Sequence, residues 1–443
     1  MNLAESSALA LAAREQGWEE TKNADEAALI LINTCSVRAT AEQRVIGRLA
    51  HYAALKKKRR FSLVLAGCMA ERLGEKAKKQ GADFIMGTSA RSRFPMILEA
   101  VTQGKNAANI ETDEKPEFAF SSVHYDQASE SPFRSFVPIM HGCNNYCSYC
   151  IVPYVRGREV SRSPDSILEE IRLVGEKGVR EITLLGQNVN SYRWGVGSRE
   201  WGIGSGELFF PGLLELIARN IEKTGVRWVR FLSSHPKDFT QETIRVLAEN
   251  PCFCRHVHLC VQHGSSRILS AMNRGYTREQ YLDLVSRLRS ALPGVSLSTD
   301  FLVGFPGETD DDFAEVLSLM EEVKFLYAYM YHFNPREGTA AFTLPNRVAE
   351  DVKRERLAGV IALQKRHTTE LLKSRIGAEV MVLIEGISKK NADELISRTE
   401  RDERVVLPGN KSLIGSFARL TLSSLRGNTF RANTLSRGMQ WFV

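Results

Sequence analysis

The sequence predicts an α/β protein made of an open parallel sheet, a partial (β/α) barrel and a small antiparallel β-barrel of the OB-like type. Through most of the chain, short apolar runs alternate with helical patterns, as is typical of parallel strands joined by crossover helices. After residue 372 the pattern changes to short strands separated by glycines, which indicates an antiparallel barrel. The chain has 443 residues, more than one hydrophobic core accommodates, so we expect several domains.

Three apolar runs predict the open parallel sheet. They lie at residues 28–32, 62–66 and 83–86, and a helical pattern over 39–58 separates the first two. Cys35 follows the first run and Cys68 follows the second. Because the carboxyl ends of parallel strands meet at one edge of a sheet, we expect both cysteines at the same edge.

Six later apolar runs, with helical patterns between them, predict the partial barrel. These strands are expected at 136–140, 181–185, 228–232, 257–261, 296–303 and 326–331. A polar stretch without an apolar period precedes them and is typical of a linker. We therefore divide the chain into residues 1–112, a linker at 113–131, residues 132–366 and residues 367–435.

The composition is typical of a soluble globular protein, with 43% hydrophobic and 25% charged residues. The sequence has no apolar run long enough to span a membrane and no secretory signal pattern at its start, so we expect a cytoplasmic monomer. Eight cysteines are too few for a disulfide scaffold in a chain of this length, and they point to metal or redox chemistry. Residues 367–443 hold 12 basic and 8 acidic residues, which favours contact with nucleic acid.

The strongest local signal is the segment MHGCNNYCSYC, in which Cys143, Cys147 and Cys150 fall at i, i+4 and i+7. Three thiolates in one loop can hold an iron-sulfur cluster and leave one iron open to a further ligand. A zinc site with His141 as the fourth ligand, or ordinary buried cysteines, are the alternatives. Three cysteines within eight positions favour the cluster.

This segment resembles the C-x3-C-x2-C motif of the radical S-adenosylmethionine superfamily, including the aromatic Tyr149 before the last cysteine. The resemblance implies a 4Fe-4S cluster whose open iron binds S-adenosylmethionine through its amino and carboxylate groups. In that superfamily one electron cleaves the cofactor to a 5′-deoxyadenosyl radical, which abstracts a hydrogen atom.

Four more strings resemble the methylthiotransferases within that superfamily: IVPYVRGRE at 151–159, GQNVNSY at 186–192, SHPKD at 234–238 and MNRGY at 272–276. The similarity covers nearly the whole chain. It implies an N-terminal methylthiotransferase domain, a radical domain and a C-terminal TRAM RNA-binding domain.

The resemblance also implies an activity on tRNA. The enzyme would insert sulfur at C2 of N6-isopentenyladenosine next to the anticodon and methylate it, with S-adenosylmethionine as both radical source and methyl donor. Its partners would be tRNA, a sulfur source and an electron donor such as flavodoxin or ferredoxin.

Family members carry a second 4Fe-4S cluster, held by three cysteines of the N-terminal domain. Cys35 and Cys68 match two of them, and the third is absent from this sequence. In the family the missing residue lies just before a Met-Asn pair that resembles Met1-Asn2. A start codon placed too late, a truncated chain and the loss of the sulfur-donating site are three explanations, of which we favour the first.

The family pattern implies further site residues. Cofactor contacts are expected from Tyr149, Gly186, Gln187, Asn188, Gln262 and Asp300. Arg156 and Arg158 follow the cysteine loop and are expected to meet a substrate phosphate or carboxylate. Phe430 and Trp441 are expected to be exposed aromatic contacts for RNA.

One string departs from the family pattern H-L-P-V-Q-S-G-S, because this chain has Cys260 and His263 where the family has proline and serine. A single cysteine on an apolar strand is typical of a small buried side chain, and we favour this over a metal ligand. Cys252 and Cys254 receive no role.

Two alternative functions stay open. One is a sibling methylthiotransferase that acts on threonylcarbamoyl-adenosine or on an aspartate of a ribosomal protein. The other belongs to a different class: an RNA-binding iron-sulfur protein without methylthiolation, which the missing third cysteine favours.

Overall fold

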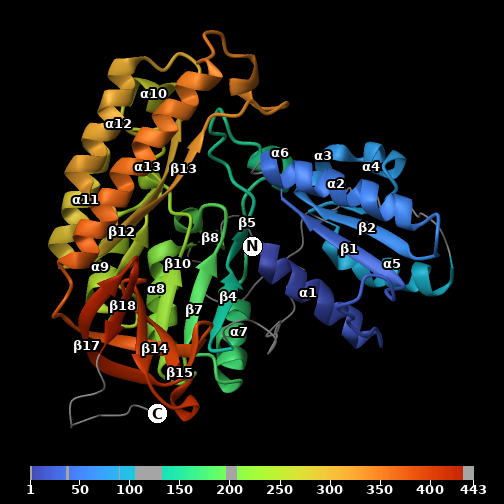
Figure 1. The fold of residues 1–443 in the computed structure, drawn as a ribbon, viewed down its shortest axis with the longest axis horizontal. Coiled ribbons are helices and arrows are strands. Elements are labelled where there is room, and N and C mark those ends of the chain that lie inside the picture. The colour runs from blue at the N-terminus through green and yellow to red at the C-terminus, as the bar shows by residue number, and fades with distance from the viewer. Residues whose placement is uncertain (1, 36–38, 89, 105–131, 196–206, 433–443) are drawn as a thin grey trace. The chain divides into compact units, whose positions relative to one another are not determined.

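The computed structural model describes residues 2–35, 39–88, 90–104, 132–195 and 207–432 (Figure 1). The chain forms two compact units. The first, here called the N-terminal unit, comprises residues 1–125, 141–146 and 150–162. The second, the C-terminal unit, comprises residues 126–140, 147–149 and 163–443. The expected linker at 113–131 lies outside the described residues.

The N-terminal unit is built on a parallel sheet with strand order β1-β2-β3. Successive residues of a strand point to opposite faces, so Leu63 and Leu65 pack on one face while Val64 and Ala66 pack on the other. Helices therefore cover both faces: α2, α3 and α4 lie on the first, and α1 and α5 on the second (Figure 1). The elements are α1 (Asn2–Glu15), β1 (Leu29–Thr34), α2 (Ala39–Leu55), β2 (Ser62–Gly67), α3 (Cys68–Leu73), α4 (Glu75–Lys79), β3 (Phe84–Met86), a 3-10 turn (Arg91–Arg93), α5 (Phe94–Thr102) and α6 (Val152–Arg156).

The C-terminal unit begins with a partial barrel of six parallel strands, as predicted. Its two three-stranded sheets have the orders β10-β7-β4 and β11-β12-β13, and isolated bridges such as Ser234 to Leu259 connect them. The strands are β4 (Arg134–Pro138), β7 (Glu181–Leu185), β10 (Trp228–Phe231), β11 (His256–His258), β12 (Ser296–Val303) and β13 (Tyr327–His332). Short strands lie at β5 (Met140–His141), β6 (Val160–Ser161), β8 (Arg193–Trp194) and β9 (Leu208–Phe209).

Amphipathic helices follow the barrel strands and bury their apolar faces against them. Side-chain caps fix several helix starts; Thr277, for example, forms a capping box with Gln280. The helices are α7 (Pro164–Glu176), α8 (Phe210–Ile221), α9 (Gln241–Glu249), α10 (Ser266–Ala271), α11 (Arg278–Ala291), α12 (Asp310–Val323) and α13 (Glu350–Lys373). Among the described residues, no helix is long and apolar enough to cross a membrane.

The end of the C-terminal unit is a closed barrel with strand order β14-β15-β16-β18-β17, which confirms the predicted OB-like class. Its strands are β14 (Glu379–Ser388), β15 (Asn391–Thr399), β16 (Arg404–Pro408), β17 (Phe417–Arg426) and β18 (Thr429–Ala432). The expectation for Phe430 is wrong, because closure of the barrel places this side chain in its core with 0% exposure. Trp441 lies outside the described residues.

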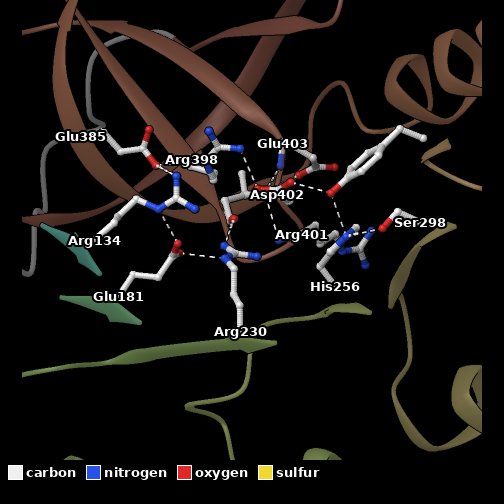
Figure 2. A network of polar contacts seen from close by, with 12 residues as sticks. Arg134, Glu181, Arg230, His256, Ser298, Glu385, Arg398, Arg401, Asp402 and Glu403 are labelled. Carbon is white, nitrogen blue, oxygen red and sulfur yellow. Dashed lines mark hydrogen bonds and ion pairs between the residues drawn. The ribbon is translucent and has the colours of Figure 1, made fainter. Parts of the chain in front are cut away.

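A network of charged side chains joins the partial barrel to the closed barrel within the C-terminal unit (Figure 2). Glu181 on β7 accepts hydrogen bonds from Arg134 Nε at 2.6 Å and from Arg230 Nε at 2.9 Å. Arg230 in turn donates to the backbone carbonyls of Thr399 and Glu400 in the closed barrel. The two barrels are therefore held together by buried, directional bonds as well as by apolar packing.

Candidate functional site

The first part of the cysteine loop belongs to the N-terminal unit and begins at Gly142. Gly142 has a φ of +78°, and a Cβ there would lie 2.0 Å from the Arg158 carbonyl oxygen, so only glycine fits. The Cys143 backbone N–H donates to the Gly157 carbonyl at 3.2 Å. The Asn144 N–H donates to Glu159 Oε1 at 3.2 Å. The string RGRE thus holds the backbone that carries Cys143.

The second part of the loop, Cys147 to Tyr149, belongs to the C-terminal unit. Ser148 anchors it, because its N–H donates to the Met272 carbonyl at 3.0 Å and its hydroxyl to the Ala271 carbonyl at 2.9 Å. Tyr149 packs against a core cluster that includes Met272. These bonds fix the position of Cys147 on the partial barrel.

Arg274 donates a hydrogen bond from Nη1 to Cys147 Sγ at 3.3 Å. Its other nitrogens are also bonded: Nη2 donates to the Cys260 carbonyl at 2.6 Å and Nε to the Tyr276 hydroxyl at 3.1 Å. Burial acts to lower the pKa of Arg274, but Tyr276, Tyr149 and Cys147 raise it well above its usual value. A fixed positive charge therefore faces a sulfur of the cysteine loop.

Unsatisfied polar atoms gather at the carboxyl ends of β7 and β10. Gly186, Gln187 and Asn188 follow β7, and the Val189 N–H donates to the Ser233 carbonyl beside β10 at 3.3 Å. Three atoms there are buried without a hydrogen-bond partner in the described part of the chain: Asn188 Oδ1, Ser234 Oγ and His235 Nε2. Buried polar atoms normally have partners, so this edge is suited to a polar ligand.

His235 is neutral at this edge. Burial, with the positive charges of Arg274 and Lys237, lowers its pKa to about 2. Its Nδ1 accepts the Lys237 backbone N–H at 3.2 Å, so Nε2 carries the ring proton and is a donor. The edge therefore offers both a hydrogen-bond donor and an acceptor.

Gln262, in the segment after β11, lies beside Asp300 in the middle of β12. The Gln262 N–H donates to the Asp300 carbonyl at 2.9 Å, and Gln262 has a φ of +72°, a strained conformation for a residue with a side chain. The Asp300 carboxylate lies 3.0 Å from His258 Nε2. Burial acts to raise the pKa of Asp300, but His258, Cys260 and Arg274 lower it below the usual value.

His263, the other departure from the family string, has a structural contact. Its Nε2 lies 3.2 Å from Glu308 Oε2, and both side chains are fully buried. Its Nδ1 accepts the Ser265 backbone N–H at 3.0 Å. Arg356 completes the group with a bond of 2.8 Å to Glu308. This imidazole therefore fixes the turn that follows β11.

In the N-terminal unit, Cys35 and Cys68 directly follow the paired residues Thr34 and Gly67 of neighbouring strands. Both cysteines therefore lie at one edge of the sheet, as the sequence predicted. They are the two cysteines among residues 1–112 of the sequence, which is one fewer than a three-thiolate cluster site requires. The donor set at this edge does not fit a complete site, and we derive no step through it.

Arg156 and Arg158 lie in different environments. Arg156 is buried and donates to Glu5 Oε1 at 2.7 Å, and burial opposed by Glu5 and Cys68 leaves its pKa above the usual value. Arg158 is exposed. Only Arg158 presents its side chain to solvent.

The chemistry of the donors in the Cys143 loop fits a four-iron cluster. Cysteine thiolate is the ligand that such clusters take, and three of them leave one iron for a cofactor. The Arg274 N–H that points at Cys147 Sγ is the kind of charged donor that stabilises a cluster thiolate.

Comparisons with known proteins agree with this arrangement. The Radical SAM superfamily matches residues 137–320, and the Uncharacterized protein family UPF0004 matches residues 1–87. The partial barrel and its cysteine loop, together with these matches, define a radical S-adenosylmethionine protein.

Sequence relatives assign the chain to one family within the radical S-adenosylmethionine proteins. The chain is 49% identical to the tRNA-2-methylthio-N(6)-dimethylallyladenosine synthase of Treponema denticola, over 98% of this chain and 97% of the relative. It is 46% identical to the synthase of that name from Treponema pallidum, over 98% and 96% of the two chains. The chain belongs to the family of tRNA-2-methylthio-N(6)-dimethylallyladenosine synthases.

Solved structures support the fold alone. The radical S-adenosylmethionine methyltransferase TsrM from Kitasatospora setae, with cobalamin and a 4Fe-4S cluster bound, has a TM-score of 0.58 and 15% identity. The match covers 76% of this chain and 73% of that one.

Three residues of the described site had no assigned role in the sequence. Arg274, Ser234 and His235 lie in strings that resemble the family, but their contacts depend on tertiary structure. A usable signal existed for Ser234 and His235, because polar residues directly after a barrel strand point to a site. Arg274 had no such local signal.

Proposed function

We propose that this protein inserts sulfur at C2 of N6-isopentenyladenosine beside the anticodon of tRNA and methylates it. The observation that carries this proposal is near full-length similarity to synthases named for that product, combined with the intact cysteine loop. In the reaction a C2–H bond is replaced by a C2–S bond, and the sulfur receives a methyl group. When bound, the cluster and S-adenosylmethionine supply the hydrogen-abstracting radical and the methyl group.

Cys143, Cys147 and Cys150 are the proposed ligands of the cofactor-binding 4Fe-4S cluster. Arg274 acts as a positioning residue, because its hydrogen bond to Cys147 holds the sulfur and offsets its negative charge. Its burial prevents water from replacing that bond. Cys35 and Cys68 are proposed as two of the three thiolate ligands that an auxiliary cluster requires, so this pair alone does not complete the site.

The polar edge at β7, β10 and β12 is the proposed cofactor site. The unsatisfied Asn188 Oδ1 suits an ammonium donor, and the His235 Nε2–H suits a carboxylate. Gly186, Gln187, Gln262 and Asp300 complete this edge, and Tyr149 packs beside it in our proposal. The low pKa of His235 keeps its donor and acceptor roles constant through the physiological pH range.

An aromatic pair beside the cluster loop is the proposed contact for the substrate base. The Tyr146 and Tyr154 rings have centroids 5.9 Å apart and an interplanar angle of 84°, and their exposed fractions are 40% and 53%. Exposed aromatic rings stack on unpaired bases, and Arg158 is available for a phosphate. Arg156 instead supports this segment through Glu5.

The closed barrel is the proposed TRAM domain, at residues 367–435. Its basic excess suits the RNA backbone. We further propose the boundaries 1–112 and 132–366 for the other domains, a cytoplasmic monomer, a flavodoxin or ferredoxin as electron donor, and a separate sulfur source.

The test is a nucleoside analysis of tRNA by mass spectrometry. A strain that lacks the gene is complemented with wild type, with Cys147→Ala, or with Cys252→Ala as a control at a half-buried cysteine without a proposed role. Wild type and the control should restore the 2-methylthio group on N6-isopentenyladenosine, and Cys147→Ala should not.

Three results would overturn the proposal. Restoration by Cys147→Ala would exclude cluster chemistry at this loop. A change confined to threonylcarbamoyl-adenosine would favour the sibling activity. If tRNA keeps its methylthio group in the deletion strain while the purified chain binds tRNA, the alternative of an RNA-binding protein without methylthiolation is favoured, because Cys35 and Cys68 alone make an incomplete auxiliary site.

A further inference from the structure

Three side chains with metal-binding atoms converge where β11 ends beside the middle of β12. His258 Nε2 lies 3.2 Å from Cys260 Sγ and 3.0 Å from an oxygen of Asp300. The three donor atoms all lie within 4.8 Å of one another. Cys260 is the residue that replaces the proline of the family string, so the complete group of three depends on this departure.

The backbone around these donors is held in place. The Cys260 N–H donates to the Ser234 carbonyl at 3.2 Å, and the Cys260 carbonyl accepts from Arg274 at 2.6 Å. The Asp300 carbonyl accepts from Gln262 on the neighbouring strand. Donors on strand ends keep their geometry better than donors on free loops.

The imidazole is also oriented for ligation. His258 Nδ1 lies 2.9 Å from Ser298 Oγ, a fully buried hydroxyl. A metal-binding histidine commonly donates its other ring N–H to such an oxygen, which fixes the ring and leaves Nε2 for the metal. The Ser298 hydroxyl is therefore placed to accept the Nδ1–H of His258 and to hold the ring while Nε2 binds the metal.

The spacing suits a small divalent ion. Zinc bonds of about 2.0 to 2.3 Å place neighbouring tetrahedral donors about 3.3 to 3.6 Å apart. The observed separations of 3.0 and 3.2 Å are slightly shorter, because hydrogen bonds now join these atoms. Side-chain shifts of about 0.4 Å would open the space. One thiolate and one carboxylate also neutralise the two positive charges of a divalent ion.

We propose that His258, Cys260 and Asp300 bind a zinc ion through nitrogen, sulfur and oxygen and leave its fourth position open. The mixed donor set favours zinc over magnesium or calcium, which prefer oxygen alone. The side chain of Asp300 is 22% exposed, so an ion can reach the site. This inference does not depend on the proposed function. Asp300 cannot bind zinc and contact S-adenosylmethionine at the same time, so zinc should weaken cofactor binding.

The test measures zinc in the full chain after its cluster has been reconstituted without oxygen. Wild type, Cys260→Ala and the control Cys252→Ala are incubated with zinc sulfate, desalted and analysed by mass spectrometry for zinc per chain. Wild type and the control should hold about one zinc more than Cys260→Ala. Zinc on cysteines other than Cys252 and Cys260 is common to all three chains and cancels in the comparison, and the control reports any zinc held by Cys252.

Cobalt provides a second measurement. Co²⁺ in place of zinc should give a thiolate-to-cobalt absorption band in the difference spectrum, and this band should be absent from Cys260→Ala and weaker in His258→Asn. Cys260→Ser, which preserves the side-chain size, serves if the alanine variant does not fold. Equal zinc content in wild type and the Cys260 variants, or an unchanged cobalt band, would show that these side chains form only hydrogen bonds.

Discussion

Replacing Glu181 with alanine tests the polar network between the two barrels of the C-terminal unit (Figure 2). The Glu181 side chain is 1% exposed and accepts from Arg134 at 2.6 Å and from Arg230 at 2.9 Å. The Arg230 side chain is itself only 6% exposed. Glu181→Ala therefore removes the carboxylate and leaves the buried Arg230 guanidinium without the acidic side chain that it bonds directly.

The magnitude follows from that burial. Removal of one partner of a buried ion pair costs about 3 to 5 kcal/mol, because the remaining charge stays out of water. Arg230 keeps two bonds to the backbone carbonyls of Thr399 and Glu400, so we expect the lower end, about 3 kcal/mol. At about 2 to 4 °C per kcal/mol for domains of this size, the melting temperature should fall by about 6 to 12 °C.

The assay is thermal unfolding followed by circular dichroism under anaerobic conditions. Glu176→Ala is the matched control, because Glu176 pairs with Arg172 on an exposed helix surface, where solvent screens the ion pair and it adds little stability. Glu181→Met combined with Arg230→Met should recover most of the loss, since no unpaired charge remains buried. A melting temperature for Glu181→Ala within about 1 °C of that of the control would show that the buried carboxylate adds no net stability.

Three further predictions concern the candidate site. Arg274→Gln should lower the reduction potential of the cluster by about 60 to 120 mV, because a charge-assisted hydrogen bond of about 1.5 to 3 kcal/mol to Cys147 is lost. A redox titration monitored by electron paramagnetic resonance measures the potential. An unchanged potential would contradict the role of Arg274. Tyr154→Ala should raise the KM for tRNA about 5- to 150-fold at unchanged iron content, because base stacking of about 1 to 3 kcal/mol is lost. Steady-state kinetics should show no such change for the exposed control Phe209→Ala. Stability should fall on acidification, because the pKa of His235 is about 2 in the fold against about 6.5 for an unperturbed histidine, so the unfolded chain binds an extra proton between these values. His235→Asn should reduce the pH dependence of the free energy of unfolding below pH 6.5 by about 1.4 kcal/mol per pH unit. Melting temperatures of wild type and His235→Asn, measured from pH 7 to pH 5, test this. If both proteins lose stability equally with falling pH, His235 does not have this role.

Several expectations from the sequence agree with the structure because they depend on local pattern. The run at 296–303 forms β12 over the same residues, and the helical pattern at 39–58 forms α2 over Ala39–Leu55. The spacing of apolar residues and the helix-capping residues act within a few positions of the chain, so they can be recognised in the sequence without tertiary structure. The shared sheet edge of Cys35 and Cys68 followed from the rule for parallel strands.

Other features were not predictable from local pattern. Phe430 was expected on the surface, but barrel closure places it in the core. Its short strand, β18, joins the sheet between β16 and β17, and this non-consecutive strand order decides its burial. Local pattern also gave no sign that the pairing of β11 with β12 brings Cys260 beside His258 and Asp300.

The sequence by itself determined the class of chemistry, because the spacing of Cys143, Cys147 and Cys150 is a property of one short loop. It also determined the order of strands and helices, which depends on periodicity. Only the tertiary structure decided which charged side chains bond to Cys147 and Arg156. Arg274 lies 127 positions from Cys147, and Glu5 lies 151 positions from Arg156. Contacts over such separations depend on strand order and close packing, which no local pattern encodes.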